Sequence, residues 1–345
     1  MGEIKFLRWL SGETKSTWWH DSADPDELKA SIENGAVGVT TNPLLIKLSL
    51  FSRPEIWNSV LSSVPKDLQG AEKAEAILGK ITTSLAGIMM PVYDRTHGEQ
   101  GYVCAQVNPA KPGNAELMLA MARRLTKLSP NIAVKLPVTA AGLEALEECA
   151  AEGITVTLTA SFTVSQALAI GEGYKKGSER AKNAGIKPAK CFAVLMIGRL
   201  DDYLRDVAMD RRSGIAEEDI IQAGIAVAKR TYSIFNERQY EATILPAGMR
   251  GTYHMTELAG AKMIFSTAPS IQKMVSKLEE PFHERINIPV NPSVINRLMR
   301  LSEFVRAYEP DGMKPEEFIT YGVTQKTLSQ FVEAGWLPLE TYKLV

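Results

Sequence analysis

Short runs of apolar and β-branched residues alternate along the chain with longer segments whose apolar residues recur every three or four positions. Eight such runs occur, at residues 17–21, 36–41, 101–107, 132–138, 153–159, 190–198, 241–247 and 261–267. Nearly continuous apolar runs are typical of parallel strands buried on both faces, and the intervening segments, such as 115–128, 140–153 and 165–177, have the helical period. Eight β/α units favour an α/β fold of the (β/α)8 TIM-barrel type over an open doubly wound sheet.

Two stretches exceed what a minimal barrel needs. Residues 43 to about 90 are long for one helical connection and are predicted to hold two or three helices. After the eighth strand, helical patterns recur at 293–308 and 324–336. Because no Gly/Ser-rich linker precedes them, we expect a catalytic barrel over residues 1–270 and a helical C-terminal extension over residues 271–345, packed on the barrel.

The charge balance and the cysteine spacing limit the partners and the cellular location that the protein is expected to have. Lys plus Arg is 39 against 40 for Asp plus Glu, a net charge of −1, and no long block of one sign occurs. This balance argues against a nucleic acid or an anionic membrane as the main partner. Cys104, Cys149 and Cys191 form no CxxC pair, which predicts a reducing, cytoplasmic location. No stretch approaches the roughly 20 apolar residues of a membrane span.

The sequence also lacks several cofactor motifs. It contains no HExxH, Walker loop, GxSxG or GxGxxG after the first strand, and its four histidines are scattered. His20, the histidine nearest the strand ends, is expected to pack or cap locally. Neither a metal nor another cofactor is expected.

Lys135 is the most informative single residue, because it lies within the predicted fourth strand, IAVKLPV. If Val134 and Leu136 face the helices, Lys135 faces the barrel interior. Burial lowers a lysine's pKa, and nearby arginines act in the same direction, which leaves the free amine that Schiff-base chemistry requires. The alternative is a structural lysine that reaches solvent or pairs with a carboxylate.

Asp21 and Asn42 end the first two predicted strands. Asp24 suits the N-cap of the following helix, because Pro25 follows it and Glu27 lies three residues further on. Asp21 is therefore not needed as a cap, and it could either transfer a substrate proton or stabilise a turn. Asn42, in Thr40-Thr41-Asn42-Pro43, fits an ordinary helix cap as well as a substrate contact.

Two arginines follow the sixth and seventh strands. Arg199 comes after Gly198, and Arg250 comes after Gly248 and Met249. Barrel phosphate sites favour the late strands, and the planar donor fork of arginine suits phosphate. Solvated loop arginines are the alternative, although the matching positions favour a shared role.

These motifs together resemble the transaldolase family, which includes the fructose 6-phosphate aldolases. The resemblance runs from about residue 16 to 275 and is carried by GVTTNPLLI, VKLPVTAAGLEAL, TLTASFTVSQA, IGRLDDYL and PAGMRGTYHMTELAGA. It implies a Schiff-base role for Lys135, acid/base catalysis by Asp21 and a water-positioning hydroxyl on Thr159. The substrate-binding residues that it implies are Asn42, with Thr41 beside it, and the phosphate-binding pair Arg199 and Arg250.

Four features depart from the family pattern. Gln106 stands where transaldolases have a catalytic glutamate and where the aldolases have glutamine. Met196 replaces an aromatic residue that is phenylalanine in transaldolases and tyrosine in the aldolases, and Val194 replaces a phosphate-supporting serine. The segment PVYDRTHGEQ at 91–100 is also unlike the family, and we expect it to reshape the mouth of the barrel.

The resemblance implies a transferase that moves a dihydroxyacetone unit between sugar phosphates. An aldolase that splits off dihydroxyacetone is the alternative, since Gln106 favours it and the missing tyrosine opposes it. A non-catalytic relative that binds a sugar phosphate is a third possibility, against which Lys135 and Asp21 argue. The implied partner is a small sugar phosphate, and a homo-oligomer is compatible with the family.

Overall fold

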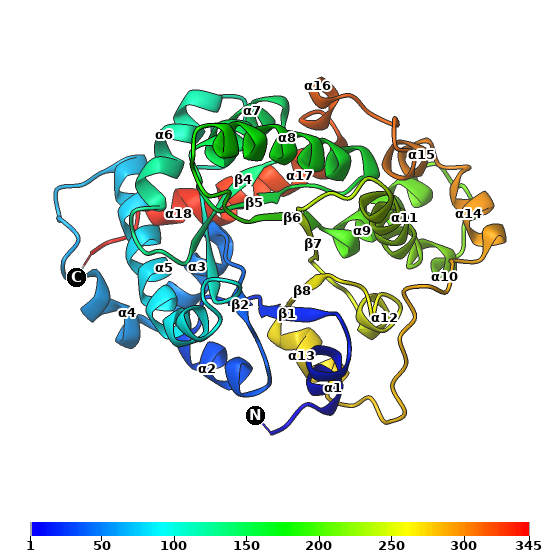
Figure 1. Cartoon of the computed structure of the whole chain (residues 1–345), viewed down its shortest axis with the longest axis horizontal. Helices are drawn as coiled ribbons and strands as arrows, with labels where there is room; N and C mark the ends of the chain where they lie inside the picture. The colour runs from blue at the N-terminus through cyan, green and yellow to red at the C-terminus, as the bar shows by residue number, and fades with distance from the viewer. Residues whose placement is uncertain (1, 345) are drawn as a thin grey trace.

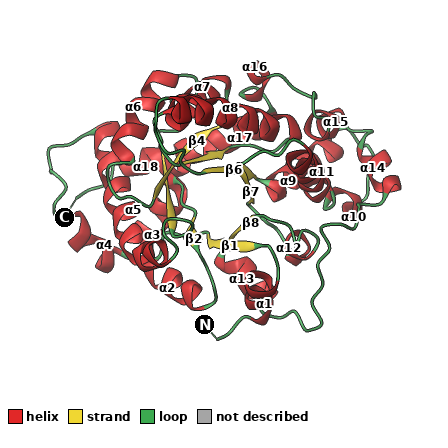
Figure 2. Cartoon of the chain, viewed as in Figure 1, coloured by secondary structure: helices red, strands yellow, loops and turns green. Residues whose placement is uncertain are grey.

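Eight parallel strands form the centre of the molecule, as the sequence pattern predicts (Figure 2). The computed structural model describes residues 2–344. The strands are β1 (Thr17–His20), β2 (Gly38–Val39), β3 (Tyr102–Gln106), β4 (Ile132–Pro137), β5 (Val156–Thr159), β6 (Cys191–Leu195), β7 (Thr243–Pro246) and β8 (Ile264–Thr267). Each pairs in parallel with the next from β1 to β7, and β1 also pairs with β8. Strands β7 and β8 lie side by side, so the barrel is nearly closed.

Helices surround this barrel (Figure 1). The first group is α1 (Lys5–Glu13), α2 (Pro25–Glu33), α3 (Pro43–Ser52), α4 (Pro54–Leu61), α5 (Gly70–Arg95), α6 (Ala115–Leu125), α7 (Ala140–Ala151), α8 (Val164–Asn183), α9 (Ile197–Asp210) and α10 (Glu217–Ile220). The second group is α11 (Ala223–Glu237), α12 (Thr252–Thr256), α13 (Pro269–Val275), α14 (Pro292–Leu298), α15 (Ser302–Tyr308), α16 (Pro315–Phe318), α17 (Gly322–Phe331), the π-helix η1 (Val332–Trp336) and α18 (Leu337–Glu340). The long connection after β2 holds three helices, within the predicted range.

Side-chain caps explain why several helices begin where they do. The carboxylate of Asp24 accepts hydrogen bonds from the backbone amides of Asp26 and Glu27 at the start of α2, so the predicted cap is present. The sixth strand is shorter than predicted. It ends at Leu195, because Met196 is already the N-cap position of α9.

Helix α5 corrects the expectation that no segment is long and apolar enough to cross a membrane. Its length and a mean hydropathy of 1.3 over 18 residues meet that condition, but half of this window is buried inside the protein. Its contacts with β3, α4 and α18 make it a helix of the core. Apolar length alone cannot separate a buried helix from a membrane span.

The C-terminal helices pack on the barrel's outer helices. The predicted helix at 293–308 is interrupted, because α14 ends at Leu298 and α15 begins at Ser302. Further on, α17 contacts α9, η1 contacts α3, and α18 contacts α5 (red in Figure 1). At Gly335 a Cβ atom would lie 2.6 Å from the backbone nitrogen of Leu44, so the close approach of η1 to α3 requires glycine.

The segment 91–100 lies elsewhere than expected. Its first residues complete α5, and the remainder turns into the start of β3. It therefore belongs to the N-terminal end of the barrel and does not reshape the mouth at the strand C-termini. The expectation was wrong because the segment precedes β3, whereas the mouth is formed by the residues that follow the strands.

Candidate active site

Lys135 points into the barrel from β4. Its ammonium nitrogen, Nζ, donates a hydrogen bond of 2.9 Å to the backbone oxygen of Thr41, which follows β2. Only 5% of the residue is exposed, and Gln106 lies beside it in the β3–β4 register. The interior placement predicted from alternation is therefore present, and the alternative of a lysine extending into solvent is excluded.

The surroundings of Lys135 favour its neutral form. Burial lowers its pKa, because the charged ammonium loses its hydration, and the Arg199 guanidinium lowers it further. Cys104 and Asp21 act in the opposite direction, but the pKa remains below the usual value. The amine is thus closer to the reactive, unprotonated state than an exposed lysine would be.

Asp21 follows β1 and lies within electrostatic reach of both Lys135 and Arg199. Its carboxylate accepts a 2.7 Å hydrogen bond from the hydroxyl of Thr40, which is also 2.6 Å from the hydroxyl of Ser266 on β8. This chain fixes the carboxylate at the strand ends. The roles of Thr40 and Ser266 were not found from sequence, because isolated hydroxyl residues at strand ends carry no distinctive pattern.

Gln106 and Thr159 also lie in the buried strand layer near Lys135. The amide oxygen of Gln106 is buried and has no hydrogen-bond partner among the described residues. A buried acceptor without a partner is costly, so this atom is suited to a water molecule or a substrate group. The Thr159 hydroxyl lies 3.9 Å from the sulfur of Met196, which gives it only a weak partner.

Asn42 and Thr41 have structural contacts of their own. The Asn42 side-chain oxygen caps α3 by accepting a 3.0 Å hydrogen bond from the amide of Leu45, which is the ordinary helix-start alternative. The Thr41 hydroxyl donates a 2.7 Å bond to the backbone oxygen of Cys104. These contacts hold the β2–α3 turn against β3, so the turn can present its backbone to Lys135.

The two arginines differ in how their charges are neutralised. Arg250 is exposed, and its guanidinium forms a 2.7 Å ion pair with Asp202. Arg199 is partly buried and forms no ion pair within residues 2–344, and its guanidinium lies 5.6 Å from the centre of the Phe331 ring. Burial lowers the pKa of Arg199, and Arg250 acts in the same direction. Of the two arginines, Arg199 is thus the one whose positive charge an anionic ligand would neutralise.

A buried pair behind the arginines fixes the β7–α12 loop. His254 and Asp201 have no exposed side-chain surface, and His254 Nε2 lies 2.8 Å from the Asp201 carboxylate. The other ring nitrogen, Nδ1, accepts a 3.1 Å hydrogen bond from the backbone amide of Arg250. This pair has no signature in the sequence, because its members lie 53 residues apart.

The other histidine near the strand ends, His20, faces outward. Its Nδ1 atom lies 2.9 Å from the hydroxyl of Ser31 and 3.1 Å from the amide nitrogen of Gln272. The expected local packing of His20 is therefore present. Across the described part of the chain, no group of three or more His, Cys, Asp or Glu residues could hold a metal ion.

Comparison with known proteins adds independent information. The model of a family described as Transaldolase/Fructose-6-phosphate aldolase matches residues 18–320. The transaldolase of Thiobacillus denitrificans is 28% identical over 234 residues, which are 64% of each chain. Transaldolase 1 of Streptomyces avermitilis is 31% identical over 253 residues, or 68% of this chain and 64% of that protein. The transaldolase of Mycobacterium tuberculosis is 30% identical over 64% of this chain and 61% of its own length. The chain thus spans less than two thirds of the length of these relatives.

Proposed function

The chain belongs to the transaldolase/fructose-6-phosphate aldolase family, and from this premise we propose that it is a Schiff-base transferase that moves a dihydroxyacetone unit from a ketose phosphate to an aldose acceptor. The observation that carries the proposal is the buried Lys135 amine, whose pKa is lowered and which lies near both Asp21 and Arg199. A free amine, a carboxylate and an anion-binding group are the side chains that this chemistry needs.

In the proposed reaction, the Lys135 nitrogen attacks the C2 carbonyl of the ketose, and loss of water gives an iminium. Asp21 accepts the proton of the C4 hydroxyl as the C3–C4 bond breaks, and the bond electrons pass into the iminium to give an enamine. The aldehyde product leaves, and the enamine carbon then attacks an incoming aldehyde. Asp21 returns its proton to the new hydroxyl oxygen, and water hydrolyses the resulting iminium, which releases the ketose product and the free Lys135 amine. We propose that Gln106 and Thr159 hold the water that is released and later consumed, which the unpartnered amide oxygen of Gln106 and the weakly bonded hydroxyl of Thr159 support. No added cofactor is required.

Arg199 is proposed to hold the phosphate of the substrate. It has no ion-pair partner among the described residues, whereas the guanidinium of Arg250 is already paired with Asp202. We propose that Arg250 contributes mainly through the field at the mouth of the barrel. Asn42 and Thr41 would contact the sugar through the turn that they fix. The enzyme would act in cytoplasmic carbohydrate metabolism.

A second candidate is an aldolase that releases dihydroxyacetone. The neutral, buried Gln106 favours this activity, because the enamine must be protonated and hydrolysed by water whose orientation the amide would set. The two activities share the Lys135 adduct and differ in whether water or an aldehyde consumes the enamine.

Borohydride reduction in the presence of dihydroxyacetone tests the shared step. We expect a mass increase on the peptide that contains Lys135 and none in the Lys135→Met variant. An unmodified Lys135 would contradict both enzymatic functions. Transfer to erythrose 4-phosphate that is faster than release of free dihydroxyacetone would support the transferase, and the reverse order would support the aldolase.

Asp21→Asn separates adduct formation from cleavage. The amide cannot accept the C4 hydroxyl proton, so the trapped adduct should remain while turnover falls by about 100-fold or more. The matched control is Asp26→Asn, which removes an exposed carboxylate on α2 and should leave turnover unchanged. Normal turnover in Asp21→Asn would refute the proton-transfer role.

A further inference from the structure

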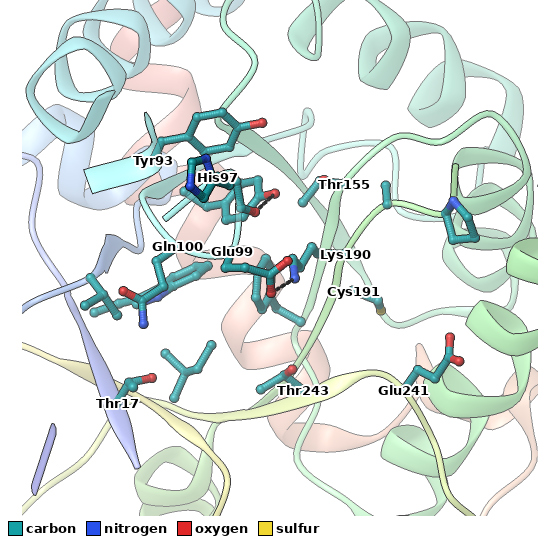
Figure 3. Close-up of a pocket in the computed structure, with 18 of the residues that line it drawn as sticks. Thr17, Tyr93, His97, Glu99, Gln100, Thr155, Lys190, Cys191, Glu241 and Thr243 are labelled. Carbon is teal, nitrogen blue, oxygen red and sulfur yellow. Dashed lines mark hydrogen bonds and ion pairs between the residues drawn. The ribbon is translucent and has the colours of Figure 1, made fainter. Parts of the chain in front are cut away.

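A hollow of about 660 Å³ opens at the N-terminal end of the barrel (Figure 3). Among the residues that line it are the first residues of several strands: Thr17, Tyr102, Cys191, Thr243 and Ile264. Asp21 lies four residues beyond Thr17 along β1, a separation of roughly 13 Å for an extended strand. The hollow is therefore distinct from the candidate active site and has a different lining.

The segment 93–100 builds one wall of this hollow (Figure 3). The Thr96 hydroxyl donates a 2.8 Å bond to the Val92 oxygen and accepts a 3.0 Å bond from the Gln100 amide. The hydroxyl of Tyr102 donates a 2.7 Å bond to the Gly98 oxygen. These bonds hold a turn in which His97 has a φ of 52°, a conformation uncommon for residues other than glycine. The wall is thus a fixed structure.

An ion pair crosses the hollow. Glu99, in the segment before β3, pairs with Lys190, in the segment before β6. Figure 3 shows this pair among the other labelled residues of the lining. The floor beneath it is aromatic, since the Phe192 ring packs 4.6 Å from the Trp19 ring and 5.6 Å from the Tyr102 ring, between ring centres.

The rim carries more positive than negative charge. Four lysines line the hollow, Lys15, Lys187, Lys190 and Lys262, and so do the carboxylates of Glu99 and Glu241. Within the described residues, Lys190 is the one lysine of the four that forms an ion pair. Lys15, Lys187 and Lys262 are exposed and come from three separate segments, so their charges converge on the hollow only in the folded chain.

The lining also offers groups that bind hydroxyls. Thr17, Thr243 and Gln100 also line the hollow, and Figure 3 shows Glu241 well apart from Thr17 and Gln100. The carboxylates of Glu99 and Glu241 would repel a small inorganic anion. Such an anion would also occupy only a small part of the hollow, whose volume is many times the roughly 30 Å³ of a water molecule. A volume of this size instead matches an organic ligand.

We propose that this hollow is a second binding site, which takes a phosphorylated sugar or polyol. The phosphate binds to the ammonium groups of Lys187, Lys190 and Lys262, and the hydroxyls bind to the carboxylates and threonines of the lining. The aromatic floor packs against the carbon face of the ligand. Ligand phosphate replaces Glu99 as the partner of Lys190, and the bound ligand then bridges the segment 93–100 and the start of β6. This site does not depend on the proposed catalytic function.

Calorimetric titration with glucitol 6-phosphate tests the proposal. This compound has a phosphate and hydroxyls but no carbonyl, so it cannot form an adduct with Lys135. The titrations use the full-length Arg199→Met variant, in which binding at the opposite end is weakened. We expect saturable binding of one equivalent, and inorganic phosphate should bind at least about tenfold more weakly because it lacks hydroxyls. Equal affinity for the two compounds would contradict the sugar or polyol assignment.

Two charge-reversal pairs locate the binding. When Lys187→Glu and Lys262→Glu are added to the Arg199→Met protein, binding of glucitol 6-phosphate should weaken at least about tenfold, because two ammonium groups are replaced by carboxylates that repel the phosphate. The control pair, Lys80→Glu and Lys127→Glu, makes the same total change of charge at exposed lysines outside the lining. Added to the same protein, it should change the affinity for glucitol 6-phosphate less than about threefold. No binding to the Arg199→Met protein, or equal effects of the two pairs, would refute the second site.

Hydrogen exchange on the unaltered chain gives a test that needs no variant. Glucitol 6-phosphate should slow exchange in residues 96–102 and in the segment that leads into β6. Protection confined to the C-terminal ends of the strands would place all binding at the candidate active site and overturn the proposal.

Discussion

At the scale of single residues, the chemistry of Lys135 depends on where the barrel places its neighbours. Alternation along β4 turns the side chain inward, and burial then lowers its pKa. Arg199 lies some 60 residues away in sequence and adds to this effect, whereas Arg250 is not among the groups that shift the Lys135 pKa. The two arginines are therefore predicted to have separable effects.

Removing Arg199 should raise the pKa of Lys135. The amine reacts only when unprotonated, so adduct formation rises as pH increases through this pKa. In Arg199→Met the rise should move to higher pH, and in Arg250→Met it should stay in place. The measurement is the rate of borohydride trapping with dihydroxyacetone, which carries no phosphate and is therefore insensitive to phosphate binding. Identical profiles for Arg199→Met and the unaltered protein would contradict the coupling.

His20 should make stability depend on pH. Burial lowers its pKa from 6.5 to about 4. In this range the unfolded chain binds a proton that the folded protein does not, so the free energy of unfolding should fall as pH drops from about 7 to about 4. The loss attributable to His20 is about 3 kcal/mol, measured by urea unfolding. His20→Gln should flatten this part of the pH profile, whereas His97→Gln, which alters an exposed histidine, should leave it unchanged.

At the scale of elements, the buried Asp201–His254 pair joins α9 to α12. Arg199 lies in the first turn of α9, and Arg250 lies in the loop before α12, where the His254 ring accepts a hydrogen bond from the Arg250 backbone amide. We infer that His254 is a positioning residue. It acts on the mouth of the barrel through the loop and makes no direct contact with the proposed reacting atoms.

His254→Leu should leave the buried Asp201 carboxylate with the backbone amide of Gly224 as its remaining hydrogen-bond partner. The expected cost is about 3 to 5 kcal/mol of unfolding free energy, and KM for a phosphorylated acceptor should rise more than kcat falls. Combining His254→Leu with Asp201→Asn removes the buried charge. The double variant should regain part of the lost unfolding free energy, whereas its KM for the phosphorylated acceptor should stay raised. If stability and KM recovered together, the positioning role would be wrong.

At the scale of the whole molecule, the helical C-terminal extension contacts distant parts of the barrel. Phe331 is fully buried and lies beside Arg199, and Gly335 approaches the start of α3 next to Asn42. The extension thus touches elements that carry two of the candidate substrate-binding residues. We expect it to unfold together with the barrel.

Phe331→Ala tests this cooperativity. Loss of a buried phenylalanine should cost about 3 to 5 kcal/mol, and the transitions followed by tryptophan fluorescence and by circular dichroism should still coincide. Phe51→Ala, which truncates a phenylalanine that is 53% exposed, should cost less than about 1 kcal/mol. Separate transitions for the two signals would mean that the extension folds independently.

The hydrophobic pattern alone determined the barrel, because strands buried on both faces and amphipathic helices each have a local period. It also predicted that Lys135 faces inward if Val134 and Leu136 face the helices, and the structure confirms this orientation. Asp21 and Asn42 were recognisable because they follow predicted strands and lie in motifs that resemble the transaldolase family, although for both residues a structural role could not be separated from a functional one by sequence.

Only the tertiary structure decided how the charged groups around the site are paired. The ion pair of Arg250 with Asp202, the unpaired Arg199 and the Asp201–His254 pair depend on contacts between separate helices and loops, which no local period encodes. The misplacement of the segment 91–100 has a different cause. The segment directly precedes the third strand, so chain order alone places it at the N-terminal end of the barrel, whereas the expectation rested only on its unlikeness to the family.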